Sequence, residues 1–389
     1  MLNTLRKVWR RGRALLPAQG FAFGRPLVVL QSDDWGRVGV RDREGWEQLR
    51  EVGLNLGERS YDFYSLETAE DVAAVVSMLH RHRDSTGRPA CLGINFIVAN
   101  VDFAKVAADN FRQIQLRSLA EGLPDGWKRP GLFEAYREGI SAGVLAPALH
   151  GTTHFCRPAV ERHLNDPGER GDLLRTLWNA GVPYIHWRMP WIGFEYWDAE
   201  RPRDDFLSSP AQESLIDSAV EDFRAFFSKA PRSACAPGYR ANHSTHDAWA
   251  THGIQVAQNG PGSAIPPRFD ANGVLHLYRS MDFEPAIVQD FSLDTCLRIA
   301  EDCFARGLPA IVSVHSINFH STLKDFRSRT IELLHQFLSA LEAKHPDLLY
   351  VHDEDLYDLV DTGTVQSTVR VPVTKRKFTA GMVAGGWRA

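Results

Sequence analysis

The sequence predicts an α/β protein built on a parallel sheet or barrel, and three observations lead to this prediction. Apolar stretches of strand length alternate along the chain with longer stretches of helical periodicity. Such alternation is typical of parallel strands that are connected by helices. In addition, an acidic pair and a histidine pair each follow an apolar stretch directly, and α/β barrels carry their reactive side chains at the carboxyl ends of strands.

The predicted strands are short apolar stretches bounded by glycine, proline or polar residues. They cover residues 27–31, 92–98, 146–149, 184–187, 234–237, 255–258, 310–314 and 348–351. The predicted helices lie between them and repeat apolar residues every three or four positions, which turns one apolar face toward the core. They cover residues 69–82, 131–142, 214–227, 293–304 and 323–343.

The composition is that of a globular protein able to bury a large core. Of 389 residues, 44% are hydrophobic and 24% are charged, which suffices for one large domain or two smaller ones. We find no internal repeat and no clear linker, so we expect one barrel domain over residues 21–361, with an aromatic-rich insertion around residues 184–210. The net charge of -4 gives no reason to expect a nucleic-acid partner.

Both ends of the chain are free of acidic residues. Residues 1–20 combine arginines with apolar residues at helical spacing, which predicts a basic amphipathic helix that lies on an anionic membrane surface or packs on the domain. The basic tail of residues 362–389 either pairs with the N-terminal region or is mobile. Since neither a membrane-spanning stretch nor a secretory signal is evident, we expect a cytoplasmic protein, with peripheral contact at the inner face of the membrane left open.

The five cysteines are odd in number and form no C-x-x-C pair. We expect small buried thiols in a reducing compartment. A catalytic nucleophile built on Cys235 is disfavoured, because no nearby residue marks this thiol as activated.

Asp33 and Asp34 close the apolar stretch that begins at residue 27, and His150 and His154 follow a second apolar stretch. One carboxylate and two imidazoles are a typical ligand set for a catalytic divalent metal ion that keeps a position open for water or substrate. Histidines four residues apart share one face of a helical or tightly turned segment. Adjacent residues of a regular strand point to opposite faces, so one aspartate would reach the metal while the other addresses the bound water. The alternative is a capping aspartate pair and surface histidines.

Four short motifs, taken in order, resemble those of the polysaccharide deacetylase family, the NodB-homology or carbohydrate esterase 4 group. Residues 31–36 are similar to its TFDD-like strand end, and residues 150–154 to its H-[S/T]-x-x-H motif, with glycine in place of the hydroxyl residue. Residues 235–239 are similar to its R-x-P-Y-G-like loop, and residues 311–316 to its strand ending in L-x-H. The resemblance spans roughly residues 27–316 and implies a distorted (β/α) barrel of the NodB/glycoside hydrolase-deacetylase type.

The resemblance also implies an activity and a set of residue roles. The protein would be a metal-dependent hydrolase that removes an N-acyl group, acetyl or formyl, from an amino sugar or from a polysaccharide or glycolipid precursor. A divalent metal ion, with Zn2+ as the first choice, would be held by Asp34, His150 and His154. Asp33 would take a proton from the attacking water, and His315 would protonate the departing amine. For His315, a buried core histidine is the alternative.

Two departures from the family pattern concern its arginine and its tryptophan motif. Cys235 stands where many relatives carry the arginine that orients the catalytic aspartate, and Arg188 and Arg240 are the candidates to replace it. The tryptophan-containing motif has its nearest counterpart in residues 281–284. We further expect the backbone N–H of Tyr239 to help stabilise the oxyanion.

The residues expected to contact substrate lie in two segments. The aromatic cluster of residues 184–197 either walls a carbohydrate groove, since aromatic faces stack on sugar rings, or forms a hydrophobic plug or an oligomer interface. Residues 242–246 either contact the substrate or support the metal ligands, or Ser244 or Thr245 simply caps the helix that begins near residue 247. The candidate substrate-binding residues are Trp187, Arg188, Tyr239, Arg240, Asn242 and His243.

Two other functions stay open. The protein would be a noncatalytic, metal-containing carbohydrate-binding relative if the loss of the motif arginine had abolished turnover. A glycosidase ranks last, because adjacent aspartates cannot readily flank a bond at the required separation of roughly 5–9 Å. The sugar, the acyl group and the oligomeric state are not determined by the sequence.

Overall fold

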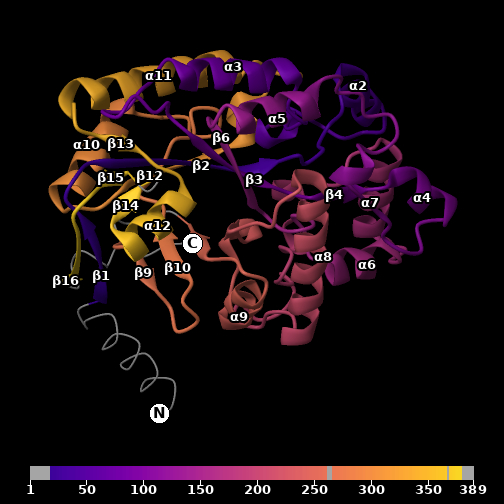
Figure 1. Cartoon of the computed structure of the whole chain (residues 1–389). Helices are drawn as coiled ribbons and strands as arrows, with labels where there is room; N and C mark the ends of the chain where they lie inside the picture. Colours follow the sequence, from indigo (N-terminus) through magenta and orange to yellow (C-terminus); the bar gives the residue numbers. More distant parts are fainter. Residues whose placement is uncertain (1–17, 261–264, 366–367, 379–389) are drawn as a thin grey trace, which may run out of the picture.

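The structure, a computed structural model, describes the chain except for residues 1–17, 261–264, 366–367 and 379–389 (Figure 1). At its centre lies one sheet with the strand order β11-β12-β2-β3-β6-β7-β8-β10-β9, and β13 pairs with β2. All neighbouring strands on this path are parallel except β9 and β10. The strands are β2 Leu27–Trp35, β3 Leu92–Phe96, β6 Leu145–Leu149, β7 Ser233–Cys235, β8 Val256–Asn259, β9 Arg268–Phe269, β10 Leu275–Tyr278, β11 Met281–Asp282, β12 Ala310–His315 and β13 Leu349–Tyr350. The predicted α/β class with a parallel sheet is therefore confirmed.

The central strand β2 is buried along its whole length, because a parallel sheet is covered on both faces. Its residues alternate between two hydrophobic clusters. Val28 and Leu30 belong to the large core, whereas Leu27 and Val29 belong to a second, smaller core. The period of two that defines a strand thus places one apolar face of β2 in each core.

Helices cover the sheet, and three of them, α3, α5 and α11, lie side by side over one face (Figure 1). α10 packs against α11, and α8 packs against α9. Helix starts are set locally, as in α3, where Thr68 accepts a hydrogen bond from the backbone N–H of Asp71. The helices are α2 Arg43–Glu51, α3 Ala69–His80, α4 Phe103–Ala108, α5 Leu132–Ser141, α6 Arg157–Leu164, α7 Glu169–Asn179, α8 Ser209–Phe227, α9 His243–Thr251, α10 Leu293–Ala305, α11 Arg327–Lys344 and α12 Asp353–Thr362.

The sheet is strongly curved, and a two-residue connection links strands near its two ends. The chain passes from β10 to β11 through Arg279 and Ser280, so these two residues connect opposite ends of the strand order. The backbone N–H of Arg279 donates to the carbonyl of Asn259 in β8 (3.2 Å), and that of Ser280 donates to the carbonyl of Ile311 in β12 (2.8 Å). No strand pairing closes a barrel within the described part of the chain; the structure has a strongly curved parallel sheet.

The predicted strand at residues 184–187 is wrong. The chain there forms a short 3-10 helix, His186–Arg188, whose backbone hydrogen bonds are local, as in the donation from Arg188 N to the Ile185 carbonyl (2.9 Å). Tyr184 and Ile185 are buried, which explains their apolar character without a partner strand. The sequence prediction also omitted β10 and β11, whose short length gives little periodicity to detect.

The described parts of the two acid-free ends of the sequence pair with each other. β1 Ala18–Phe23 pairs antiparallel with β16 Val373–Phe378, and β14 Thr364–Val365 pairs with β15 Val369–Arg370. Most of the predicted N-terminal amphipathic helix, residues 1–17, lies outside the described residues. Among the residues that are described, no helix has both the length and the apolar character needed to span a membrane. All five cysteines are buried and free.

Candidate active site

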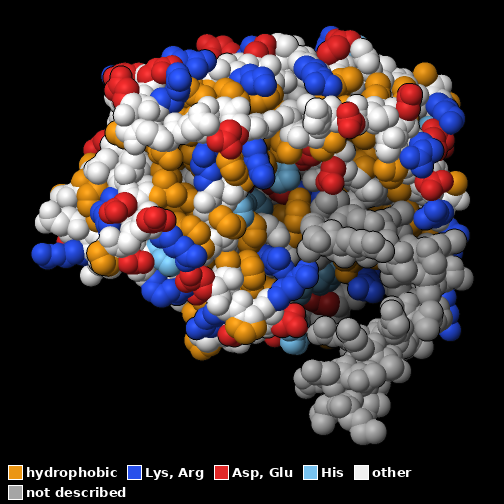
Figure 2. Space-filling model, turned by 180° about the vertical axis from the view of Figure 1, so that it is seen from behind, with side chains coloured by type: hydrophobic (Ala, Val, Ile, Leu, Met, Phe, Trp, Pro, Cys, Tyr) orange, Lys and Arg blue, Asp and Glu red, His pale blue; other side chains and the backbone are white. Residues whose placement is uncertain are grey.

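The candidate catalytic residues come from the carboxyl ends of three strands. Asp33 and Asp34 lie near the end of β2, His150 directly follows β6, and His315 is the last residue of β12. They share a cavity of about 270 Å³. On the face drawn in Figure 2, histidine side chains are visible in a hollow bordered by hydrophobic ones. The cavity is lined by Asp33, Asp34, Arg37, Tyr61, His150, His154, His186, Trp187, Phe194, Gly238, Tyr239 and His315.

The backbone of Asp34 explains how two adjacent aspartates reach one cavity. Asp34 has a φ of 73°, and the pairing of β2 with β3 shifts register between Ser32 and Trp35. Left-handed backbone costs a non-glycine residue about 1–3 kcal/mol and persists only where neighbours support it. The support here comes from Tyr64 and Ser316, whose hydroxyls donate to the Asp34 carbonyl at 2.7 and 3.3 Å. Because of this bend, Asp33 and Asp34 do not point to opposite faces, as we expected of neighbouring residues in a regular strand; both line the cavity.

Asp34, His150 and His154 present one donor atom each within 4.8 Å of one another. Oδ1 of Asp34 lies 3.3 Å from Nε2 of His154 and 3.7 Å from Nε2 of His150. Nδ1 of His150 lies 2.8 Å from the carbonyl oxygen of Cys235 and must donate to it, which leaves the Nε2 lone pair directed at Asp34.

The electrostatics of this trio fit a bound divalent cation. Burial lowers the pKa of both His150 and His154, even though Asp34 beside them acts in the opposite direction, so both imidazoles are neutral and able to ligate. Oδ1 of Asp34 is buried and has no hydrogen-bond partner among the described residues. Such an oxygen is costly unless a cation or a donor satisfies it. Two imidazole nitrogens and a carboxylate oxygen match the donor preferences of Zn2+.

The second oxygen of Asp34 faces Arg37. Nη2 of Arg37 lies 3.4 Å from Oδ2 of Asp34, and the guanidinium stacks over the ring of Tyr64 at 3.7 Å from its centroid. Burial opposes the ionisation of Asp34, but the Arg37 guanidinium holds the pKa of this carboxyl well below its usual range. Asp34 is therefore an anion with one oxygen held by Arg37 and the other directed at the imidazoles.

Glycine between the two histidine ligands has a structural reason. Gly151 has a φ of +89°, and a Cβ at this position would lie 1.9 Å from Oε2 of Glu195. Oε1 of Glu195 accepts from the backbone N–H groups of Thr152 (2.7 Å) and Thr153 (3.2 Å). The buried carboxyl of Glu195 thus holds the loop that carries His150 and His154, and it leaves no room for the hydroxyl residue that the family motif has there.

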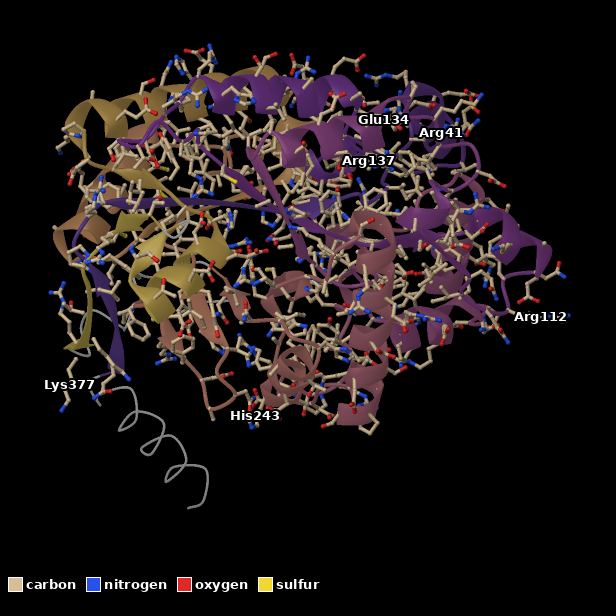
Figure 3. The ribbon with its side chains drawn as sticks, in the orientation of Figure 1. Arg41, Arg112, Glu134, Arg137, His243 and Lys377 are labelled. Atoms are coloured by element: carbon tan, nitrogen blue, oxygen red, sulfur yellow. The ribbon has the colours of Figure 1, made fainter. Side chains whose placement is uncertain are left out.

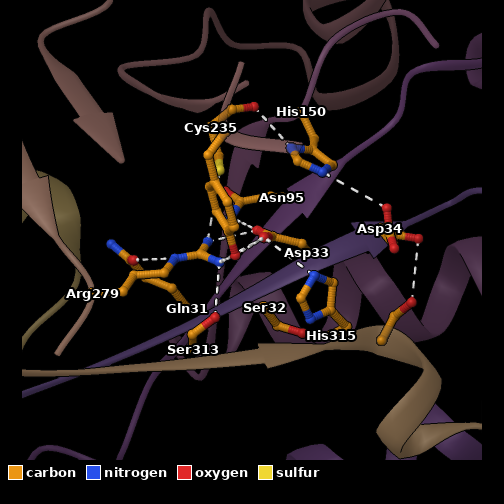
Figure 4. A network of polar contacts seen from close by, with 12 residues as sticks. Gln31, Ser32, Asp33, Asp34, Asn95, His150, Cys235, Arg279, Ser313 and His315 are labelled. Atoms are coloured by element: carbon orange, nitrogen blue, oxygen red, sulfur yellow. Dashed lines mark hydrogen bonds and ion pairs between the residues drawn. The ribbon is translucent and has the colours of Figure 1, made fainter. Parts of the chain in front are cut away.

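Asp33 forms a buried bidentate ion pair with Arg279 (Figure 4). Nη1 of Arg279 donates to Oδ2 at 2.5 Å and Nη2 donates to Oδ1 at 2.6 Å. Asn95 Nδ2 donates to Oδ1 (2.6 Å) and the Tyr239 hydroxyl donates to Oδ2 (3.2 Å). Burial would raise the pKa of Asp33, but Arg279 outweighs it and holds the pKa well below the usual range.

The arginine that pairs with Asp33 is Arg279, and neither Arg188 nor Arg240 does so. Arg188 instead pairs with Asp62 (3.0 Å), and Arg240 stacks over Trp197 at 4.5 Å from the ring centroid. Nη2 of Arg279 lies 3.8 Å from Sγ of Cys235, so its guanidinium enters from β10 beside the position where the family motif has its arginine. The signal in the sequence was an arginine that directly follows an apolar stretch, Leu275–Tyr278.

Glu284, the last residue of the segment 281–284 that resembles the tryptophan motif, is the hydrogen-bond partner of His315. Nδ1 of His315 donates to Oε1 of Glu284 at 2.6 Å, and the His315 backbone N–H donates to the same oxygen at 3.0 Å. Burial alone would lower the pKa of His315, but Glu284 raises it to about 9. Nε2 of His315 lies 3.9 Å from Oδ2 of Asp33, so a protonated imidazole stands on the Asp33 side of the cavity.

The predicted substrate residues separate into two groups. Trp187 and Tyr239 line the cavity, whereas Arg188, Arg240, Asn242 and His243 do not. Asn242 caps α9 by accepting from the backbone N–H of Thr245 (3.1 Å), and His243 is 80% exposed and points outward (Figure 3). The backbone N–H of Tyr239 donates to the Ala236 carbonyl at 2.8 Å, so the expected oxyanion contact is wrong. His186 and Phe194, which also line the cavity, belong to the aromatic segment 184–197, whereas the lining residues Arg37 and Tyr61 were not predicted.

Neither the protein-family models nor the curated proteins give a match to the sequence. Solved structures do match. A protein from Parabacteroides distasonis, provisionally assigned as a glycoside hydrolase/deacetylase, aligns with a TM-score of 0.50 and 12% identity, over 88% of this chain and 73% of that one. A polysaccharide deacetylase, also provisionally assigned, from Mycobacterium smegmatis aligns with a TM-score of 0.47 and 14% identity, over 94% and 100% of the two chains. A family 4 carbohydrate esterase from Streptomyces lividans, solved with acetate, aligns with a TM-score of 0.34 and 12% identity, over 84% and 92%.

At these identities the likeness concerns the fold alone, and of these three structures the one from Parabacteroides distasonis reaches a TM-score of 0.50. Its backbone overlaps that of the chain over 88% of this chain and 73% of its own length. The chain therefore has a divergent polysaccharide deacetylase-like fold.

Proposed function

We propose that this protein is a metal-dependent hydrolase that removes an N-acyl group, acetyl or formyl, from an amino sugar. The observation that carries the proposal is one cavity lined by both a metal-ligand trio and an acid–base pair. The trio is Asp34, His150 and His154. The pair is Asp33, which Arg279 keeps ionised, and His315, which Glu284 keeps protonated.

The residues of the chain divide the proton transfers of amide hydrolysis between them. A divalent ion, Zn2+ by its donor set, would polarise the amide carbonyl and lower the pKa of water at the site. Asp33, held by Arg279, receives the proton of the attacking water. His315 donates the proton of its Nε2 to the departing nitrogen, which is a poor leaving group unless it is protonated. Such an acid contributes on the order of 10²–10⁴ in rate.

The shape of the cavity supports a substrate of about one sugar ring. Its volume of about 270 Å³ is near the low end of ligand pockets, which span roughly 300–1,000 Å³. Tyr61, Trp187 and Phe194 line it and offer aromatic faces of the kind that stack on sugar rings. We therefore favour the reacting end of an acylated amino sugar, free or in a polysaccharide or glycolipid precursor. The cytoplasmic location and the membrane contact stay predictions, since residues 1–17 lie outside the described part of the chain.

Arg279 removes the reason for preferring a noncatalytic carbohydrate-binding protein. That alternative rested on Cys235 in the place of the family arginine, and the guanidinium of Arg279 lies within 3.8 Å of the Cys235 sulfur and pairs with Asp33. The site accordingly has the carboxylate–guanidinium pair that turnover would need.

The proposal is tested by assaying acyl release from N-acetyl and N-formyl amino sugars with protein reloaded with Zn2+ after chelation. We expect acetate or formate to appear with the reloaded protein and not with the chelated protein. Asp33→Asn is the matched control, because it keeps the metal ligands and removes the base. Zn2+ binding without acyl release from any acylated amino sugar would favour a binding protein, and release of reducing sugar in place of acid would favour a glycosidase.

A further inference from the structure

A second set of metal-type donors lies outside the cavity, between α9 and the β9–β10 hairpin. It consists of His246 in α9, Asp270 in the turn of the hairpin and His276 in β10. One donor atom of each lies within 4.8 Å of the others. None of the three lines the candidate active-site cavity.

The carboxylate of Asp270 is oriented by the hairpin turn. Its Oδ1 accepts from the backbone N–H groups of Asn272 (2.9 Å) and Val274 (3.0 Å). Its Oδ2 lies 3.2 Å from Nε2 of His276, whose residue is 7% exposed. One oxygen of Asp270 is thus used by the turn, and the other is fixed next to a buried imidazole. A carboxylate anchored in this way needs no reorganisation to ligate an ion.

His246 completes the set from the neighbouring helix. Its ring meets that of His276 nearly edge to face, with centroids 4.6 Å apart and planes at 88°. Nε2 of His246 is buried and has no hydrogen-bond partner in the described ranges of the chain. The unpartnered ring nitrogen of His246 therefore lies beside the Asp270 carboxylate and the His276 ring, where a cation could bind all three.

We propose that His246, Asp270 and His276 form a second divalent-cation site, of the zinc type, that fastens α9 to the β9–β10 hairpin. Around one Zn2+, with bonds of about 2.0–2.2 Å, neighbouring donors lie roughly 3.4 Å apart. Donors that already lie within 4.8 Å reach this spacing by small side-chain rotations. The guanidinium of Arg268, in β9, donates to the Tyr278 hydroxyl at 3.0 Å.

The position of the site suggests what the ion would do. β10 leads directly into Arg279, and α9 directly follows the loop that carries Tyr239. Both Arg279 and Tyr239 contact Asp33. An ion between α9 and β10 would therefore hold together the two segments that position this aspartate. The inference does not depend on the proposed hydrolase activity, since it concerns metal content alone.

The test is the zinc stoichiometry of the full-length protein and of matched variants, measured by equilibrium dialysis and elemental analysis. Asp270→Asn is the sharpest variant, because asparagine keeps an Oδ1 acceptor for the turn and removes the anionic ligand. We expect Asp270→Asn and His246→Gln each to bind one equivalent of zinc less than the wild-type protein. His252→Gln is the control for surface histidines, since His252 caps the end of α9 and lies 3.9 Å from Asp217; it should bind as much zinc as wild type.

The two metal sites are separated by combining Asp270→Asn with Asp34→Asn. We expect each single variant to lose one equivalent and the double variant to lose both, so failure of one site does not hide the other. Anomalous diffraction at the zinc edge on wild-type crystals gives an independent result that does not need a folded variant. A peak between His246 and His276 supports the proposal. Unchanged zinc content in Asp270→Asn and His246→Gln, or the absence of that peak, would overturn it.

Discussion

Arg279, in the connection between β10 and β11, and Asp33, on the central strand β2, form a buried, bidentate ion pair with N–O distances of 2.5 and 2.6 Å. Arg279 also donates to Gln31 Oε1 (2.9 Å) and to the Ser313 hydroxyl (3.0 Å). These bonds fix the guanidinium in one orientation, and the guanidinium in turn fixes Asp33. The pair joins the β10–β11 connection to β2 and β12 at the point where the candidate chemistry lies.

Replacing Arg279 should therefore cost both stability and activity. Arg279→Gln leaves the Asp33 carboxylate buried without its partner, and removing one member of a buried ion pair typically costs about 3–5 kcal/mol of unfolding free energy. Urea unfolding measures this loss. Arg137→Gln is the control, because Arg137 forms an exposed pair with Glu134 on the surface of α5 (Figure 3), and such pairs contribute about 0–1 kcal/mol. Equal stability of the two variants would show that the Asp33 pair has no structural role.

The pH dependence should report the pair of His315 and Glu284. With a pKa raised to about 9, His315 is protonated at neutral pH, and the activity that depends on its proton is lost as the pH rises through about 9. Glu284→Gln removes the carboxylate that raises this pKa, so burial then dominates and the alkaline loss moves to lower pH. Profiles of kcat/KM against pH measure the shift. An alkaline limb that stays in place in Glu284→Gln, as it should in the exposed control Glu134→Gln, would exclude His315 as the acid.

Metal binding and proton transfer should be separable by mutation. His150→Ala removes an imidazole nitrogen from the trio, so we expect loss of both zinc and activity. Asp33→Asn leaves the trio intact, so we expect wild-type zinc content with activity lower by about 10²–10⁴, the usual contribution of a positioned acid or base. Elemental analysis and acyl release, measured on the same samples, test both statements. Loss of zinc in Asp33→Asn would place Asp33 among the ligands.

The glycine of the histidine motif should not tolerate the hydroxyl residue that the family has there. Gly151→Ser places a Cβ against Glu195 Oε2, 1.9 Å away in the present geometry, at a φ of +89°. We expect destabilisation of about 1–3 kcal/mol from the backbone alone, together with weaker zinc binding as the loop shifts. In Gly151→Ser/Glu195→Ala the clash is absent, so part of the zinc affinity should return. Wild-type zinc affinity in Gly151→Ser would show that Glu195 does not constrain this loop.

The parts of the site that could be predicted from the sequence are those set by local spacing. His150 and His154 are four residues apart after an apolar stretch, and Asp34 closes another such stretch; the structure brings one atom of each within 4.8 Å. The alternation of apolar stretches likewise predicted the parallel sheet. These features depend on a few neighbouring residues, so a short pattern in the sequence can predict them.

The parts that could not be predicted depend on how distant segments close on one another. Arg279 reaches Asp33 only because the sheet curves until β10 leads into β11 beside β12, and no local pattern encodes that curvature. The left-handed backbone of Asp34 could not be predicted, because a glycine would be the usual signal for it and none stands there. The hydroxyl groups of Tyr64 and Ser316 stabilise this conformation. The apolar residues at 184–187 predict a strand, but burial beside a cavity selects the same residue types as burial in a sheet, and the structure has a 3-10 helix there.

The central claim is that Asp34, His150 and His154 hold one divalent ion beside Asp33. Anomalous diffraction at the zinc edge, on crystals of the full chain reloaded with Zn2+, tests it most directly. The account predicts a peak about 2.0–2.2 Å from a carboxylate oxygen of Asp34 and from Nε2 of both histidines, with Asp33 still paired to Arg279. A crystal in which Zn2+ binds elsewhere, while Asp34 points away from the two imidazoles, would contradict it.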